Sequence, residues 1–255
     1  MGIWTAGNKM QFGNREFRPR LWPTIATIIL LPILLRLGFW QLDRAQEKRE
    51  IEQRYAEQQA RPAVELSRLD PTGQIEYRRV SVSGQFDDDR QILLDNQVHQ
   101  KRAGYHVLTP LRIGDSEEYI LVNRGWVDSH LQRDRLPEFT TPQKKVELAG
   151  RLKFPSEIGL KLGEQSYTDT SWPLVVQWLD IKELESITGY NLHPYILQLG
   201  ENEPHGFVRD WKIISSSPEK STSYAVQWFT LALALVLIFI FVNSRKIEDA
   251  KHECK

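Results

Sequence analysis

The sequence predicts two transmembrane α-helices that flank one β-rich extracytoplasmic domain of the α+β type. The prediction rests first on two apolar segments, residues 21–42 near the start of the chain and residues 224–242 near its end. Between them lie about 180 polar, strand-like residues (43–223), enough to fold around a hydrophobic core of their own. A chain anchored at both ends holds this domain at the membrane surface, so we expect it to act on a membrane-embedded partner.

The first apolar segment contains interruptions that a membrane helix tolerates. Pro32 lies inside it, and Arg36 precedes its last residues. Neighbouring helices can satisfy the backbone groups that a proline frees, and an arginine near a helix end can reach the lipid headgroups. A cleaved signal peptide is the alternative, but no A-x-A site follows the apolar run. Residues 21–42 are therefore predicted to be a transmembrane helix.

The second apolar segment is the clearer span. YAVQWFTLALALVLIFIFV contains no charged residue, and a helix needs roughly 20 apolar residues to cross a hydrocarbon core of about 30 Å. In lipid only a helix or a closed barrel satisfies its own backbone. Tyr224 and Trp228 fit an interfacial aromatic belt. The alternative is a helix buried in the core of a soluble domain.

Basic residues in the short terminal tails predict the orientation. They are Lys9, Arg15, Arg18 and Arg20 before the first span, and Arg245, Lys246 and Lys251 after the second. Because short basic flanks stay on the cytoplasmic side, residues 1–20 and 243–255 are predicted to be cytoplasmic tails. The central domain then lies in the periplasm, with the chain in a bacterial inner (plasma) membrane, or in the intermembrane space of a mitochondrion.

The central residues predict a helix followed by strands. Residues 43–60 are polar helix formers with opposite charges three or four positions apart, and Arg61-Pro62 ends them. Strand-like segments follow at residues 77–86, 90–97, 103–113, 118–127 and 146–154. Short polar linkers separate the earlier ones, as hairpin turns would.

The remaining residues complete one domain. Residues 128–145 are charged and predict an exposed loop. The later elements are predicted strands at residues 172–181, 193–200 and 207–214 and a predicted helix at residues 181–190. Several short strands with few helices favour an antiparallel sheet or a small barrel.

Composition excludes several classes of function. The net charge is +0, with Lys+Arg 33 and Asp+Glu 33, whereas a nucleic-acid-binding protein carries a basic excess. The only cysteine, Cys254, lies in the predicted cytoplasmic tail. The exported domain therefore has no disulfide, no thiolate nucleophile and no cysteine ligand for a metal.

Motifs of catalysis are absent from the sequence. It contains no P-loop, no G-x-S-x-G, no H-E-x-x-H and no G-x-G-x-x-G. None of the histidines has the close spacing of a helical metal site: His99, His106, His130, His193, His205 and His252. A non-catalytic protein without a metal site is therefore expected.

Four blocks carry a family resemblance. They are LGFWQLDRAQEK (37–48), AGYHVLTPL (103–111), YILVNRGWV (119–127) and YAVQWF (224–229), in this order. With the double anchor, they resemble the surfeit-locus (SURF/Shy) family of cytochrome c oxidase assembly factors. The resemblance implies a non-catalytic chaperone of respiratory-chain biogenesis, which assists haem a insertion into, or stabilisation of, subunit I of a haem-copper oxidase. Cytochrome c oxidase subunit I is then the expected partner, with haem a synthase as a second one and membrane lipid around both.

The candidate binding residues lie where the two spans leave the bilayer. Trp40, Arg44, Tyr224 and Trp228 are expected to contact haem a or the partner protein. An arginine binds carboxylates through a bidentate fork, which would suit haem propionates. The alternative is that all four are interfacial anchors, with aromatic rings in the belt and the guanidinium on headgroups.

Two further blocks allow a structural or a functional interpretation. Gly104 and Tyr105 open a predicted strand, where turn chemistry and core packing explain them. Asn123, Arg124, Gly125 and Trp126 end a run of strand residues. A polar pair and a glycine in this position can form a β-bulge or a site.

One position departs from the family pattern. Members often carry a histidine three residues before the Tyr-Ala of the last block, where this chain has Ser221, and neither span contains histidine or methionine. Imidazole or thioether is the usual axial ligand of haem iron, so any binding of haem a is expected to be transient. The alternative function is a membrane-anchored periplasmic ligand-binding or structural module unrelated to an oxidase; an unusual hydrolase or transferase is a third.

Overall fold

The computed structural model describes residues 11–12, 15–129, 136–137, 140–155, 171–214 and 216–246. It divides into two compact units. The helical unit comprises Met1–Glu52 and Ile214–Lys255, and the β unit comprises Gln53–Ile213.

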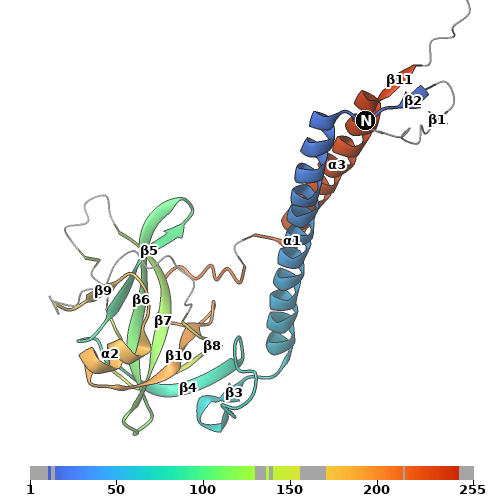
Figure 1. Cartoon of the computed structure of the whole chain (residues 1–255). Coiled ribbons are helices and arrows are strands. Elements are labelled where there is room, and N and C mark those ends of the chain that lie inside the picture. Colours follow the sequence, from blue (N-terminus) through green and yellow to red (C-terminus); the bar gives the residue numbers. More distant parts are fainter. Residues whose placement is uncertain are drawn as a thin grey trace, which may run out of the picture. The chain divides into compact units, whose positions relative to one another are not determined.

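The helical unit is built on two long antiparallel helices, α1 (Leu21–Ala60) and α3 (Pro218–Asn243) (Figure 1). Both are long and apolar enough to cross a membrane, and only 6% and 11% of their apolar windows are buried. This exposure argues against a buried core helix and fits a lipid environment. As predicted, α1 continues beyond the apolar segment to Ala60, and Pro32 lies within it.

Small residues occupy several of the buried positions of the two helices. Gly38 and Ala45 are buried on α1, and Ala225 and Ala232 on α3. A Cβ atom at Gly38 would lie 2.6 Å from the ring of Phe229 on α3. Small residues let membrane helices approach closely without the help of a hydrophobic effect between them.

Hydrogen bonds join the start of α1 to the end of α3. The Asn243 side chain accepts a hydrogen bond from the backbone N–H of Arg20 at 2.7 Å, and its carbonyl accepts one from Arg18 at 2.7 Å. Beyond this contact, β1 (Gln11–Phe12), β2 (Arg15–Phe17) and β11 (Ser244–Lys246) form a sheet in the order β1-β2-β11.

The β unit is a closed five-stranded barrel with extra strands at its margin. The barrel strands are β4 (Arg79–Phe86), β8 (Val146–Lys153), β10 (Asn191–Leu199), β7 (Glu118–Asp128) and β6 (Arg102–Ile113). They pair in that order, and β6 pairs back onto β4, which closes the ring. The marginal elements are β3 (Val64–Glu65), 3₁₀-helix η1 (Leu66–Arg68), β5 (Ile92–His99) and β9 (Leu174–Val176). The predicted small barrel is thus confirmed.

Strand direction corrects one detail of the prediction. The β10–β7 pair of the barrel is parallel, so the sheet is not wholly antiparallel. A parallel pair needs a long crossover, and the connection from β7 to β10 provides one, since it includes β8, β9 and α2 (Ile181–Thr188). Helix α2 begins after the N-cap Asp180 and ends at Gly189, which has a φ of 70°.

Two hydrophobic layers follow from strand alternation. Inward side chains fill the barrel, among them Val80, Leu111, Val122, Leu148 and Leu197. The second layer packs the outer face of β6, β7 and β10 against β5, β9 and α2; it comprises Ile92, Leu108, Leu121, Leu174, Val176, Leu184, Leu192 and Ile196. Successive strand residues point to opposite faces, so the polar residues between these outer positions also face outward.

The predicted closing strand at residues 207–214 is wrong. Only Val208 pairs, in an isolated bridge in which Trp126 N–H donates to its carbonyl at 2.7 Å. Arg209 donates to the carbonyls of Gly200 and Glu203 at 2.5 and 2.7 Å, and Trp211 Nε1 donates to Leu199 at 3.0 Å. These side-chain bonds hold the segment against the end of β10 without strand pairing.

Most of the other predicted elements agree with the structure to within about two residues, but the strand predicted at residues 172–181 is only the short β9. Residues 129, 136–137 and 140–145 form no strand, as expected for a loop, and the rest of the predicted 128–145 loop lies outside the described residues, apart from Asp128 at the end of β7. His130, His252 and Cys254 also lie outside them, as do Lys9 and Lys251 of the tails.

Candidate functional site

The four residues predicted from the sequence lie on the helical unit. The side chains of Trp40 and Tyr224 are 51% and 43% exposed, and Trp228 is partly buried. Arg44 is exposed and forms an ion pair with Glu47, one turn along α1. Within the described part of the chain, no hydrogen bond, ion pair or ring contact joins any two of these four side chains. Their role in binding stays a prediction.

Ser221 forms a polar link between the helices. It is only 5% exposed, and its hydroxyl accepts a hydrogen bond from Lys48 Nζ at 2.9 Å. Lys48 also donates to Ser216 at 2.8 Å, and Arg49 donates to Thr222 at 3.1 Å. Sequence reasoning missed Lys48, although it lies one turn beyond Arg44 on the same helix face. With its hydroxyl engaged in this way, Ser221 is poorly placed to bind haem iron.

The Asn123–Trp126 block forms a β-bulge in β7. His106 of β6 is opposite Trp126, whereas Leu108 is opposite Asn123. Two residues of β7, Arg124 and Gly125, therefore lie opposite one residue of β6, Val107, so β7 has one extra residue at this point. One of them, Gly125, has a φ of 119°, which favours glycine. Residues three apart on a regular strand face opposite sides. The bulge instead brings Asn123 and Trp126 to the same outer face of the barrel.

Arg124 stabilises this bulge from within. Its side chain is 2% exposed, and its guanidinium donates to the carbonyl of His205 at 2.7 Å, to Thr141 Oγ1 at 3.1 Å and to the carbonyl of Thr140 at 3.1 Å. The guanidinium also lies 4.8 Å from the ring centroid of Phe207. Burial lowers the pKa of Arg124 to about 10. Arg124 therefore connects β7 to two loops and is a structural residue.

Gly104 and Tyr105 also have packing roles. Gly104 lies directly against the Trp126 ring and the Val127 carbonyl, which leave no room for a Cβ atom. Tyr105 is buried in a small cluster with Leu93. The structural interpretation of both residues is thus supported.

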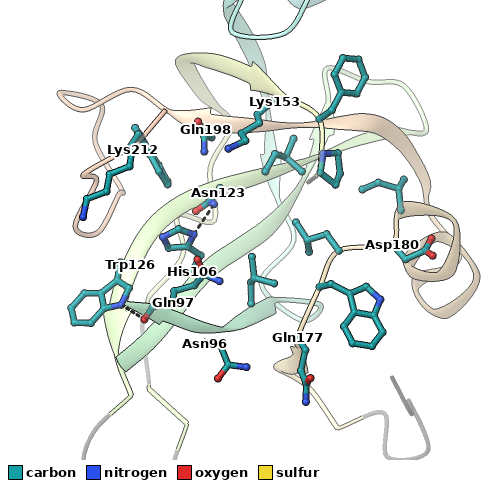
Figure 2. Close-up of a pocket in the computed structure, with 18 of the residues that line it drawn as sticks. Asn96, Gln97, His106, Asn123, Trp126, Lys153, Gln177, Asp180, Gln198 and Lys212 are labelled. Atoms are coloured by element: carbon teal, nitrogen blue, oxygen red, sulfur yellow. Dashed lines mark hydrogen bonds between the residues drawn. The ribbon is translucent and has the colours of Figure 1, made fainter. Parts of the chain in front are cut away.

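A pocket of about 1300 Å³ lies on the outer face of the barrel in the β unit (Figure 2). Its floor comes from β6, β7, β8 and β10, and residues 177–182 and 208–212 form its sides. One end is polar and contains His106, Asn123, Lys153 and Gln198. The other end is apolar and is formed in part by α2 and the residues before it.

His106 is held neutral at the polar end. Asn123 Oδ1 accepts a hydrogen bond from Gly125 N–H at 3.1 Å, so its amide nitrogen faces His106 Nδ1, at 3.4 Å. His106 Nδ1 is then the acceptor, and Nε2 carries the proton. Burial, and secondarily the Lys153 ammonium, lowers the pKa of His106 from 6.5 to about 4. The ring of Trp211 packs edge-on to the imidazole, with centroids 5.5 Å apart.

Lys153 and Gln198 add donors beside this histidine. Lys153 is half-buried at the end of β8, and burial lowers its pKa. Arg151 Nε donates to Gln198 Oε1 at 2.9 Å, which leaves the amide NH₂ of Gln198 for the pocket (Figure 2). Sequence reasoning missed this group, because its members come from three strands and only the barrel brings them together.

The other histidines make local contacts. His99 lies 3.8 Å from Asp210, and His193 lies 3.7 Å from Glu118. In the parts of the chain that the structure describes, no group of three or more His, Cys, Asp or Glu side chains could hold a metal ion.

Two long exposed helices and a five-stranded barrel define a membrane-anchored protein with a β-barrel domain. The sequence profile of the SURF1 family matches residues 28–233, which include most of both spans and the whole barrel. The chain therefore belongs to the SURF1 family, as the four blocks predicted.

Relatives named SURF1-like protein match along nearly their whole length. The protein of Rickettsia bellii is 28% identical over 240 residues, which cover 88% of this chain and 93% of the relative. That of Dictyostelium discoideum is 25% identical over 258 residues, covering 84% and 93%. That of Monosiga brevicollis is 23% identical over 225 residues, covering 82% and 83%.

Proposed function

We propose that this protein is a non-catalytic assembly factor for a haem-copper cytochrome c oxidase, which assists haem a insertion into subunit I or stabilises that subunit. The observation that carries the proposal is the match to the SURF1 family across residues 28–233, which include a large part of each anchor and the whole barrel. A double anchor favours action on a membrane-embedded partner, because it keeps the barrel domain at the bilayer.

The helical unit is the proposed contact surface for subunit I, or for haem a synthase. Its exposed Trp40 and Tyr224 offer aromatic area, and among the described residues the Arg44 guanidinium pairs only with an exposed glutamate on its own helix. An exposed pair of this kind contributes little stability and exchanges partners readily. A haem propionate or a partner carboxylate could therefore replace Glu47 on Arg44.

Haem a would bind this surface only transiently. Lys48 already bonds to the Ser221 hydroxyl, and serine is a poor haem ligand. Stable axial ligation by Ser221 is therefore not part of the proposal. Aromatic contact with Trp228 and Tyr224, together with Arg44, is the mode of binding that remains.

The proposed location is a bacterial inner membrane, with both termini in the cytoplasm and the β unit in the periplasm. The basic tails support this orientation. The proposal places the barrel on the periplasmic face of the membrane, beside the proposed partner.

A complementation experiment tests the function and the role of Arg44 together. A strain without this gene, and without a second homologue, should lose the haem a band in reduced-minus-oxidised spectra of its membranes while b-type bands persist. The wild-type gene should restore the band. The Arg44→Ala variant should reach normal abundance but restore the haem a band only in part.

The control is Arg68→Ala, because Arg68 is also exposed and also pairs with a glutamate three residues away, Glu65, at 3.2 Å. It should restore the haem a band fully. An unchanged haem a band in the deletion strain would overturn the assembly role. The alternative, a periplasmic ligand-binding module, would then remain, and the pocket of the β unit supports it. If Arg44→Ala matches Arg68→Ala, Arg44 is an interfacial anchor.

A further inference from the structure

The pocket of the β unit has an apolar end and a polar end, whose hydrogen-bond donors on Lys153, His106 and Gln198 have no partner among the described residues. From this arrangement we propose that the pocket binds an amphiphilic carboxylate, with its carboxylate at Lys153, His106 and Gln198 and its apolar body toward α2. This inference is independent of the proposed role in oxidase assembly.

The donors define the charge of the ligand. Lys153 makes no hydrogen bond or ion pair with any residue that the structure describes, although it is half-buried. His106 Nε2–H and the Gln198 amide face the same space (Figure 2). A half-buried ammonium with two neutral donors beside it favours a ligand with anionic oxygens, since charge-assisted hydrogen bonds are the strongest available. A carboxylate offers two such oxygens.

The acidic residues at the margin of the pocket are already engaged. Asp180 caps α2 by accepting from Glu183 N–H at 3.3 Å. Glu185 accepts from Leu192 N–H at 3.0 Å, and Asp210 lies 3.8 Å from His99. Burial has the largest effect on the pKa of Lys153 and lowers it, whereas the Glu76 carboxylate raises it and the Arg151 guanidinium lowers it further. No carboxylate among the described residues forms an ion pair with the Lys153 ammonium, so the polar end keeps a charged donor for an anion.

The apolar end defines the body of the ligand. Leu94, Leu192 and Ile196 come from the barrel and its margin, and Trp178, Leu179 and Ile181 come from the segment that leads into α2. Ligand pockets commonly measure about 300–1,000 Å³ and combine apolar walls with a few placed polar groups. At about 1300 Å³ this open pocket has room for a ring system or a short acyl chain.

Calorimetric titration of the full chain in detergent micelles tests the proposal. The probes are 1-naphthylacetate and its neutral amide, 1-naphthylacetamide, each with protein-free micelles as the blank. The acid should bind more tightly than the amide. Lys153→Met should weaken binding of the acid by about tenfold or more, because it removes the ammonium, and should change binding of the amide by less than about twofold.

Two further variants keep the result independent of folding. Lys144→Met removes an exposed lysine outside the pocket and should leave both probes unchanged. Gln198→Glu keeps an acceptor for Arg151 but adds a negative charge. It should therefore weaken binding of the acid and leave binding of the amide unchanged. Equal binding of acid and amide by the wild type, or an undiminished affinity of Lys153→Met or Gln198→Glu for the acid, would overturn the proposal. Absence of binding above the micelle blank would do the same.

Discussion

At the scale of single residues, the bulge in β7 depends on Gly125. Its φ of 119° lies in the region that side chains rarely adopt, and a Cβ atom there would lie 2.6 Å from the Val208 carbonyl oxygen. Gly125→Ala should therefore lower the free energy of unfolding by about 1–3 kcal/mol. Thermal unfolding of the full chain, followed by circular dichroism, measures this loss.

The matched control is Gly73→Ala. The nearest atom to its added Cβ, the Asp70 carbonyl oxygen, would be 3.7 Å away, an ordinary contact. Its effect should stay within about 0.5 kcal/mol. Similar losses for the two variants would mean that the bulge does not need the glycine.

His106 gives a pH dependence of stability with a definite sign. Its pKa is about 4 in the folded chain, against an ordinary value of 6.5. As pH falls through this window, the unfolded chain takes up a proton that the folded chain refuses, so stability is present above pH 6.5 and is lost toward pH 4. The loss is on the order of 2–3 kcal/mol.

His106→Gln isolates this contribution, because glutamine keeps an N–H donor and does not titrate. Denaturant unfolding at several pH values should show wild-type stability falling more steeply than that of the variant between pH 6.5 and 4. Parallel curves would show that the imidazole stays accessible to protons in the folded state.

At the scale of elements, α1 and α3 contact each other through a glycine and an aromatic ring. Gly38→Ala places a methyl group 2.6 Å from the Phe229 ring, so it should destabilise the helix pair. Phe229→Ala removes that obstacle. In a double-mutant cycle the two substitutions together should therefore cost less than the sum of the single ones, by at least about 0.5 kcal/mol. Denaturation of the micelle-bound chain measures the four free energies of unfolding. Additive losses would show that Gly38 and Phe229 do not contact each other.

At the scale of the whole molecule, the single cysteine reports the topology. Cys254 lies in the predicted cytoplasmic tail, so a membrane-impermeant maleimide should not label it in intact spheroplasts but should label it after lysis. In a Cys254→Ser background, Lys144→Cys in the β unit should be labelled before lysis. The reverse pattern would place the barrel in the cytoplasm and contradict the proposed orientation.

The sequence predicts those parts of the structure whose cause is local. The spans follow from continuous apolar composition, and the end of α1 follows from Pro62. A β-bulge at NRGW was one of the two alternatives that the sequence offered, because a polar pair and a glycine at a strand end can form a bulge or a site. By contrast, the parallel β10–β7 pair and the closing β4–β6 pair depend on contacts between distant residues, which no local pattern records.

The same difference between local patterns and contacts of distant residues explains which sites were predicted and which were missed. Trp40, Arg44, Tyr224 and Trp228 were predicted because each lies near the end of an apolar run, and no contact among the described residues joins any two of them. The pocket was missed because His106, Lys153 and Gln198 belong to strands that are distant in the sequence and come together only in the folded sheet. The failed strand at residues 207–214 has a different cause, since side-chain bonds of Arg209 and Trp211 override its extended pattern.

The bulge also determines which changes of length the chain can tolerate. A loop between strands can gain or lose a residue with little effect elsewhere. Loss of one residue at Arg124 or Gly125 would instead invert the parity of β7 from that point onward, and Trp126 would turn toward the barrel interior. Insertions and deletions should therefore be excluded from these two positions even where neighbouring loops vary freely.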